Sequence, residues 1–116
     1  MKRDMDLIRL LLLQIEGEPP APHLSGYTDQ QKLYHLALLI EADLVDGRVV
    51  HNGQAEVAQA HVIRLTWKGH EFLDAARDQG VWDQAWKKLR EQGFQVTIAV
   101  MTELLTAVAK SRLGLG

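Results

Sequence analysis

One short stretch in the middle of the chain constrains the fold more than any other, namely Arg48-Val49-Val50-His51 followed by Asn52-Gly53. A β-branched segment closed by Asn-Gly is typical of a β-hairpin, because both turn residues tolerate the positive φ angles that a tight hairpin turn requires. We expect the return strand at residues 61–65, and the sequence leaves the register of residues 53–60 open. A strand pair is therefore predicted in the centre of a chain whose other patterned segments are helical.

Helices are predicted on both sides of this hairpin. The apolar segment at residues 4–16 ends at Gly17, and the prolines at 19, 20 and 22 prevent its continuation, because proline lacks the amide proton and disfavours helix in the residue before it. After the hairpin, the spacing of apolar residues predicts helices at about 67–79, 82–92 and 97–113, the first capped by Thr66 and ended by Gly80. The predicted fold class is mainly α with a small β-hairpin.

The helix directly before the hairpin, which begins after the N-cap residue Thr28, has two faces of different character. Its apolar face, which we expect in the core, comprises Leu33, Leu36, Ala37, Ile40 and Leu44. The opposite face carries Thr28, Gln31, His35, Leu38 and Ala42, with Lys32, Tyr34 and Leu39 beside it. We expect this second face to be available to a partner.

Length and composition favour one small domain. The chain has 116 residues, of which 47% are hydrophobic and 24% charged, a balance that suits a globular core. It has no cysteine, which excludes disulfides and thiolate chemistry, and its apolar runs, such as the four leucines at 10–13 and the five residues at 36–40, are far short of the ~20 residues that cross a bilayer. We expect a cytoplasmic protein without a membrane segment, since the first residues also lack the pattern of a secretory signal.

Two stretches of the chain resemble a winged-helix protein. The first, Tyr34-His35-Leu36-Ala37-Leu38-Leu39-Ile40-Glu41-Ala42-Asp43-Leu44-Val45, is similar to the end of a recognition helix and its turn into the wing in bacterial winged-helix repressors. The second, Arg64-Leu65-Thr66-Trp67-Lys68-Gly69-His70-Glu71-Phe72-Leu73, is similar to the Leu-Thr-x-x-Gly-x-x-x-Leu segment that leads from the second wing strand into the following helix. Asp43 stands where such proteins usually have glycine, so a left-handed backbone there would be strained, although Asp tolerates it better than most residues.

Together with the opening Met-Lys-Arg-Asp-Met-Asp-Leu-Ile-Arg and Trp82, these stretches make the whole chain similar to an uncharacterised bacterial and phage family, domain of unknown function 2513. The resemblance implies one winged-helix-like domain over residues 1–116. It places a recognition helix at 28–45, a wing at 48–65 and C-terminal helices at 81–113. It implies a fold and supplies no activity.

Double-stranded DNA is the partner that this resemblance implies. A winged helix lays its recognition helix in the major groove and its wing along the phosphates. This geometry predicts a DNA-binding set made of Gln31, Lys32, Tyr34, His35, Arg48 and Arg64. The protein would then be a DNA-associated transcription regulator of bacterial or phage origin.

The charge of the same region favours a protein partner instead. Residues 28–66 contain three Lys or Arg against five Asp or Glu, whereas DNA binding draws most of its affinity from basic residues on phosphates. Leu38 lies on the partner face, and an apolar side chain suits a protein groove better than a phosphate backbone. The alternative prediction is therefore a degenerate winged helix that acts as a protein-protein interaction module.

Catalytic, metal and cofactor functions are not predicted. The five histidines form no metal-binding motif, although His51 and His61 fall on the two hairpin segments. The chain has no glycine-rich phosphate loop and no nucleophile elbow, and its carboxylate pairs lie at helix ends or on solvated faces. We expect a binding protein rather than an enzyme.

A homodimer built from the two ends of the chain is expected. The first helix is apolar round most of its circumference, and the last helix adds Val100, Met101, Leu104, Leu105 and Val108. Soluble monomers rarely expose an apolar patch larger than a few hundred Å2, and pairing about a two-fold axis would cover it. The alternative is that the last helix folds back over its own chain.

Overall fold

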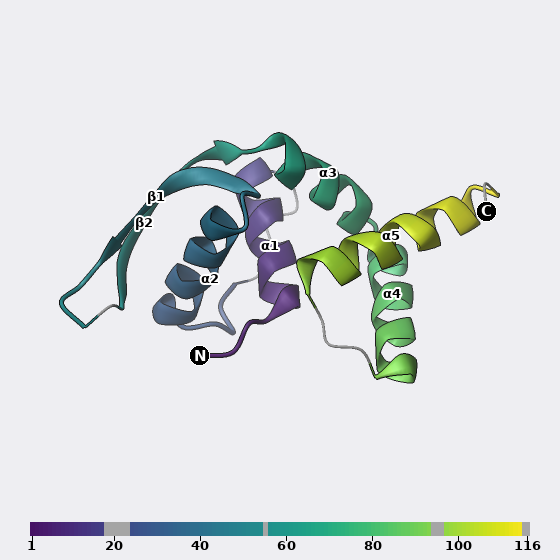
Figure 1. The fold of residues 1–116 in the computed structure, drawn as a ribbon, viewed down its shortest axis with the longest axis horizontal. Coiled ribbons are helices and arrows are strands. Elements are labelled where there is room, and N and C mark those ends of the chain that lie inside the picture. Colours follow the sequence, from purple (N-terminus) through teal and green to yellow (C-terminus); the bar gives the residue numbers. More distant parts are fainter. Residues whose placement is uncertain (18–23, 55, 94–96, 115–116) are drawn as a thin grey trace. The chain divides into compact units, whose positions relative to one another are not determined.

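The computed structural model describes residues 1–17, 24–54, 56–93 and 97–114. Its elements in chain order (Figure 1) are α1 (Met5–Glu16), α2 (Asp29–Glu41), β1 (Val45–His51), β2 (Val57–Leu65), α3 (Trp67–Ala76), α4 (Gln79–Gln92) and α5 (Ile98–Arg112). The predicted class, mainly α with a small antiparallel hairpin, is confirmed. No helix in the described part is long and apolar enough to cross a membrane. The chain divides into two compact units, Met1–Glu71 and Phe72–Gly116, and the single domain over residues 1–116 stays a prediction.

Local chemistry defines both ends of α1. The Asp4 carboxylate accepts hydrogen bonds from the backbone amides of Asp6 and Leu7, which have no partner inside the helix. Gly17 ends the helix as predicted, with a left-handed φ of 76° that costs glycine little. The prolines at 19, 20 and 22 lie outside the described residues. Most apolar side chains of the helix are buried, namely Met5, Leu7, Ile8, Leu11 and Leu12.

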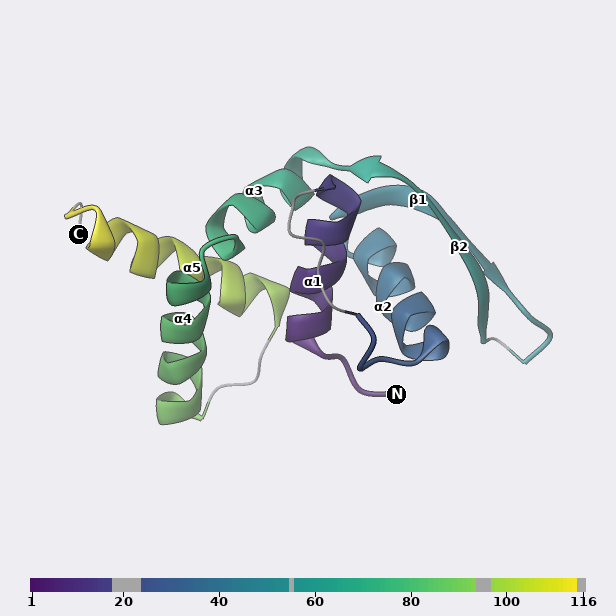
Figure 2. The ribbon, with the colours of Figure 1, turned by 180° about the vertical axis from the view of Figure 1, so that it is seen from behind.

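The second helix, α2, begins where the sequence predicts, but it buries a different face. Thr28 and Gln31 form a reciprocal capping box at its start. The buried residues of the helix are His35 and Leu39. Over the helix itself, the predicted core stripe is only half-buried, at Leu33, Leu36, Ala37 and Ile40. The predicted helical phase is therefore wrong, because α2 lies between α1 and the hairpin (Figures 1 and 2) and is partly covered on several sides.

The hairpin is longer than the sequence predicts. Its strands run over residues 45–51 and 57–65 instead of 48–51 and 61–65, because backbone pairing continues past the β-branched centre of each segment. The register pairs Val45 with Leu65 and Arg48 with His61, and it is irregular next to Gly47. A Cβ atom at Gly47 would overlap the backbone carbonyl oxygen of His61, so this glycine within β1 allows the two strands to approach.

The turn between α2 and β1 is held by the residues that begin α3. Asp43 adopts a left-handed φ of 63°, a conformation that Asp tolerates better than most residues with a Cβ atom. The Thr66 hydroxyl donates to the Asp43 carbonyl oxygen at 2.6 Å, and the Thr66 amide donates to the Leu44 carbonyl oxygen at 3.0 Å. Lys68 Nζ donates to the Ala42 carbonyl oxygen at 3.3 Å. These bonds satisfy carbonyl groups at the end of α2 that the helix itself leaves without partners.

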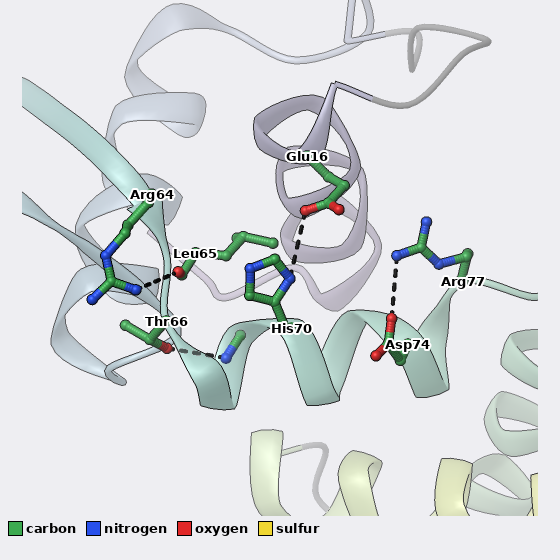
Figure 3. A network of polar contacts seen from close by, with 8 residues as sticks. Glu16, Arg64, Leu65, Thr66, His70, Asp74 and Arg77 are labelled. Atoms are coloured by element: carbon green, nitrogen blue, oxygen red, sulfur yellow. Dashed lines mark hydrogen bonds and ion pairs between the residues drawn. The ribbon is translucent and has the colours of Figure 1, made fainter.

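Thr66 also caps α3, as predicted. Its hydroxyl oxygen accepts a 3.0 Å hydrogen bond from the Gly69 amide (Figure 3). Gly69 lies so close to the α2–β1 turn that a Cβ atom there would overlap the Leu44 carbonyl oxygen. The Leu-Thr-x-x-Gly spacing in the sequence therefore has both a hydrogen-bonding and a steric basis. One residue later, His70 Nδ1 lies 3.6 Å from the Glu16 carboxylate of α1 (Figure 3).

The helix boundaries in the second unit differ from the prediction at one point. α3 ends at Ala76, and the Asp78 carboxylate caps a new helix whose first turn contains Gly80. The prediction that Gly80 ends α3 is wrong, because a carboxylate N-cap two residues earlier begins α4 instead. Gly93 ends α4 with a φ of 67°, directly after the predicted last residue 92, and α5 begins at Ile98 after the N-cap residue Thr97, one residue from the predicted start.

The apolar residues of α5 that suggested a homodimer are largely covered within the chain. Met101, Leu105 and Val108 are each 0% exposed. Val100 and Leu104 are half-buried. The exposed apolar surface from which the dimer was predicted is therefore small on α5, and dimerisation stays a prediction.

Candidate interaction groove between α2 and the hairpin

A groove of about 390 Å3 lies between α2 and the far end of the hairpin. Its lining consists of Met1, Gln30, Tyr34, Ala37, Leu38, Glu41, His51, Glu56 and Val57. All of these residues belong to the first unit, in which the hairpin arches over α2 (Figures 1 and 2). A concavity of this size accommodates a small ligand or a few side chains of a partner, which makes it the candidate functional site.

One side of α2 forms the helical wall of the groove. Its members, Gln30, Tyr34, Ala37, Leu38 and Glu41, follow one another at the spacing that aligns side chains along a single helix face. Tyr34 and Leu38 are half-buried, so they present apolar surface one turn apart and remain accessible. Ala37, which the sequence assigned to the core, lies in this lining instead.

The end of the hairpin forms the opposite wall. Val57 begins β2 opposite His51 and is 8% exposed, so its side chain anchors the wall. Gln30 Nε2 donates a 3.4 Å hydrogen bond to the Val57 carbonyl oxygen, which joins the first turn of α2 to the hairpin. The Asn52 side chain accepts a hydrogen bond from the Glu56 amide at 3.1 Å. The hydrogen bond to the Asn52 side chain therefore fixes the backbone position of Glu56, which lines the groove.

Both walls of the groove carry a carboxylate. Glu41 is the last residue of α2, Glu56 directly precedes β2, and both are exposed. Within the described residues, neither forms an ion pair with a Lys or Arg side chain. The described residues that line the groove include His51 but no Lys or Arg side chain. The groove thus combines apolar side chains with unpaired negative charge.

The residues predicted to bind DNA do not form one surface. Tyr34 and Leu38 line the groove, as described above. The side-chain oxygen of Gln31 accepts the amide of the N-cap residue at 2.8 Å, so that side chain is part of the helix cap. Lys32 Nζ lies 3.9 Å from the carboxylate of Asp29, and its side chain is 30% exposed. The first turn of α2 therefore offers fewer free polar groups than the sequence suggests.

His35 lies in the core and not on a partner surface. It is 1% exposed. Its Nε2 accepts a 2.8 Å hydrogen bond from the backbone amide of Asp4, and its Nδ1 lies 2.7 Å from the Gln31 carbonyl oxygen, which can only accept. These two partners require a neutral ring that carries its proton on Nδ1. The prediction that His35 faces DNA is wrong, because the ring is buried: Nδ1 bonds to Gln31 within α2, and Nε2 joins α2 to Asp4 at the start of α1.

Tyr27 belongs to the same junction between α1 and α2. Partial burial, the negative charges of Asp4 and Asp6, and a hydrogen bond to Asp4 raise the pKa of the Tyr27 phenol. Asp4 therefore caps α1, holds His35 through its backbone amide and contacts Tyr27. This junction fixes α2 against α1 and with it the helical wall of the groove.

Arg48 and Arg64 lie on the exposed face of the hairpin and do not line the groove. Arg48 stands opposite His61 in the register. Arg64 Nε lies 3.8 Å from the Asp46 carboxylate, and the Arg64 guanidinium donates to the Leu65 carbonyl oxygen at 3.0 Å (Figure 3). The two arginines and His61 thus form a second, weakly basic surface.

The two hairpin histidines do not face each other. The register places His51 opposite Val57 and His61 opposite Arg48. In the part of the chain that the structure describes, no three His, Asp or Glu side chains gather where they could hold a metal ion.

Several lining residues were not among the predicted site residues, namely Met1, Gln30, Ala37, Glu41, His51, Glu56 and Val57. Gln30 and Glu41 share a helix face with Tyr34 and Leu38, so helical spacing alone could have predicted them as groove residues. The hairpin members depend on the strand register, which the sequence leaves open between residues 53 and 60. No sequence pattern brings them next to α2.

Comparison with known proteins gives a family without an activity. A family model described as "Hypothetical protein (DUF2513)" matches residues 2–95. A protein of Haemophilus influenzae strain Rd, described as "Uncharacterized protein", is 26% identical over 119 residues, which cover 97% of this chain and 99% of the relative. No solved structure matches the chain significantly.

Proposed function

Because the chain belongs to the DUF2513 family, whose description names no activity, we propose its function from the groove: it is a protein-interaction module that binds a short segment of a partner protein between α2 and the hairpin. One observation carries this proposal, the pair Tyr34 and Leu38, which lie one turn apart and half-buried in an open groove. Tyrosine is among the residues that contribute most to binding energy at protein interfaces.

The size of the groove supports recognition of a few anchor side chains. A volume of about 390 Å3 is at the lower end of what ligand sites use, and protein interfaces concentrate their energy in pockets filled by a handful of residues. Ala37 leaves room beside the Tyr34 and Leu38 side chains. A partner segment with one or two apolar anchors fits this surface.

The walls of the groove are connected before any partner arrives. The Gln30–Val57 hydrogen bond joins α2 to the hairpin, and His35 joins α2 to α1. A surface that is already ordered loses less conformational entropy when it binds. This preorganisation supports a role for the groove as a receptor for a more mobile segment.

DNA binding through α2 has weaker support. His35 is buried, Gln31 caps the helix, and Lys32 lies beside the Asp29 carboxylate. Residues 28–66 also carry more acidic than basic side chains, whereas DNA binding depends on neutralising phosphates.

One observation favours a DNA-associated regulator as the second candidate. Arg48, His61 and Arg64 are exposed on the hairpin, the element that contacts phosphates in a winged helix. In this second proposal the chain is a winged-helix transcription regulator of bacterial or phage origin that contacts double-stranded DNA mainly through the hairpin.

A random peptide library displayed on phage tests the first proposal. Selection on the wild-type protein should recover peptides that bind the variant Leu38→Asp at least about tenfold more weakly. The matched control is Ile63→Asp, because Ile63 is 71% exposed on β2 outside the groove, and it should bind the peptides as the wild type does. Amide NMR shifts should map to residues 30–41 and 51–57. Peptides that bind both variants equally, with shifts elsewhere, would contradict the proposal.

Fluorescence anisotropy with genomic double-stranded DNA at low salt tests the second candidate. The double variant Arg48→Ala/Arg64→Ala should abolish binding, while Leu38→Asp should leave it intact. Undetectable binding of the wild-type protein at low salt would exclude this candidate, since electrostatic contacts are strongest there.

Self-association stays a proposal from the sequence. A two-fold dimer would present two grooves at once and raise the avidity for a repeated or dimeric partner. Light scattering at micromolar concentration should give twice the chain mass of 13.1 kDa. A mass equal to that of one chain would reject the dimer.

A further inference from the structure

We propose that the groove selects partner segments in which an arginine accompanies the apolar anchors. This inference rests on the proposed protein-interaction function and specifies the chemistry of the partner. It follows from the charges around the apolar lining and from the position of Tyr34 among them.

The carboxylates of Glu41 and Glu56 reach the groove from opposite walls, one from the end of α2 and one from the start of β2. Both are exposed, and no Lys or Arg side chain of the described residues pairs with either. A segment that enters between the walls therefore meets negative charge on two sides. A cation on that segment is attracted, and a phosphate or an acidic side chain is repelled.

The end of α2 adds to this preference. The partial negative charge at the C-terminus of a helix favours cations, yet the last turn of α2 contains no basic residue. Lys68 donates to the Ala42 carbonyl oxygen at this end but does not line the groove. The end of α2 thus adds negative potential next to Glu41, and Lys68 offsets it from outside the lining.

Tyr34 distinguishes arginine from lysine. Its ring contacts the His35 ring edge-on at a centroid distance of 5.5 Å, and His35 is itself fixed by two hydrogen bonds, so the tyrosine ring is held in place within the lining. A planar guanidinium stacks on an aromatic ring and offers five donors in a fork that suits carboxylates, whereas the compact ammonium of lysine is more strongly hydrated. The aliphatic stem of the arginine would lie along apolar side chains such as Leu38.

The peptide library described above also tests this inference. Clones whose binding is lost in Leu38→Asp are the groove-dependent set, and we expect arginine to be enriched in that set. Selection on the double variant Glu41→Gln/Glu56→Gln, which keeps size and removes charge, should lose the enrichment. The control Glu103→Gln, an exposed carboxylate on α5, should retain it.

A synthetic copy of the strongest groove-dependent peptide gives the direct measurement. Replacing its arginine by citrulline, which has nearly the same shape and no charge, should weaken binding to the wild-type protein about fivefold, the factor that corresponds to ~1 kcal/mol. The citrulline and arginine peptides should bind Glu41→Gln/Glu56→Gln equally.

The outcomes separate the two proposals. If groove-dependent peptides are recovered without arginine enrichment, or if citrulline binds as well as arginine, the arginine inference is wrong and the interaction module stands. A lysine peptide that binds as tightly as the arginine peptide would also overturn the preference for guanidinium. If no groove-dependent peptide is recovered at all, the proposed function itself fails.

Discussion

The hydroxyl group of Thr66 donates a 2.6 Å hydrogen bond to the backbone carbonyl oxygen of Asp43, a residue 23 positions earlier in the chain. Asp43 has a left-handed φ of 63°, a conformation that is costly for residues with a Cβ atom. The bond joins the start of α3 to the turn through which α2 enters the hairpin. This hydrogen bond lies outside the groove. It holds the connection between α2 and the hairpin, which form the two walls of the groove.

Removal of the Thr66 hydroxyl should destabilise this turn. Thr66→Val keeps the shape of the side chain but loses the bond to Asp43 and the cap on the Gly69 amide. We expect the free energy of unfolding, measured by urea denaturation, to fall by about 1–3 kcal/mol. Thr66→Ser keeps the hydroxyl and should lose less than ~1 kcal/mol. Equal losses in the two variants would mean that the methyl group matters and the hydrogen bonds do not.

Gly69 should tolerate no side chain. A Cβ atom at this position would overlap the Leu44 carbonyl oxygen, which is backbone and cannot move aside. We expect Gly69→Ala to lower the free energy of unfolding by about 3 kcal/mol or more. Gly53→Ala is the control, since a Cβ there meets nothing within 4 Å, and its effect should stay within ~0.5 kcal/mol. Thermal unfolding followed by circular dichroism compares them, and a Gly69→Ala protein as stable as Gly53→Ala would contradict the close approach.

His35 should behave as a core residue. His35→Ala leaves the Asp4 amide without its partner, removes the side-chain hydrogen bond to the Gln31 carbonyl and opens a cavity, so we expect a loss of about 2–4 kcal/mol in the free energy of unfolding. His61→Ala, at an exposed hairpin position, should cost less than ~0.5 kcal/mol. In the folded wild type, NMR of the imidazole nitrogens should show the proton of His35 on Nδ1. A ring that carries its proton on Nε2 would contradict the observed hydrogen-bond pattern.

Tyr27 should make the protein less stable in alkali. Its pKa is raised above the ordinary value of 10.0, so the folded protein holds the phenol proton more tightly than the unfolded chain does. This contribution to stability is fully present below pH 10.0 and is lost as the pH rises through the pKa of the folded state. Urea denaturation across this range should show a falling free energy of unfolding, with a shallower fall in Tyr27→Phe. Tyr34→Phe, which leaves Tyr27 and Asp4 in place, should retain the wild-type slope.

Helix ends were the most predictable part of the fold. Thr28, Gly17 and Thr66 act as the sequence indicates, and α4 ends and α5 begins within one residue of the predicted positions, because a cap needs partners only within a few residues along the chain. The break between α3 and α4 was predicted at Gly80 but lies at residues 77–78, because the helix-ending signal of Gly80 and the N-cap signal of Asp78 are only two residues apart. Glycine often ends a helix and a carboxylate often caps the start of one. Here the Asp78 carboxylate caps α4, and Gly80 lies in the first turn of α4.

The site was less predictable than the fold. Tyr34 and Leu38 were predicted to meet a partner, and they line the groove. The partners that complete the groove, His51, Glu56 and Val57, depend on how far the strands pair past their β-branched centres. The strands extend through backbone hydrogen bonds, which depend little on which side chains are present, so the sequence does not show how far the pairing continues.

The sequence by itself determines which segments become helices and strands, where most of them end, and that Asp43 and Leu-Thr-x-x-Gly mark the passage from helix to hairpin. These features follow from backbone sterics and capping, whose range is a few residues. Only the tertiary structure decides which face of α2 is buried. Apolar spacing favours the Leu33–Leu36–Ile40 side, yet α2 is enclosed between α1 and the hairpin, and a buried histidine is stable there because the Asp4 amide and the Gln31 carbonyl satisfy both ring nitrogens. A hydrogen bond between residues 31 positions apart has no signature in local sequence, and it leaves Tyr34 and Leu38 in the groove.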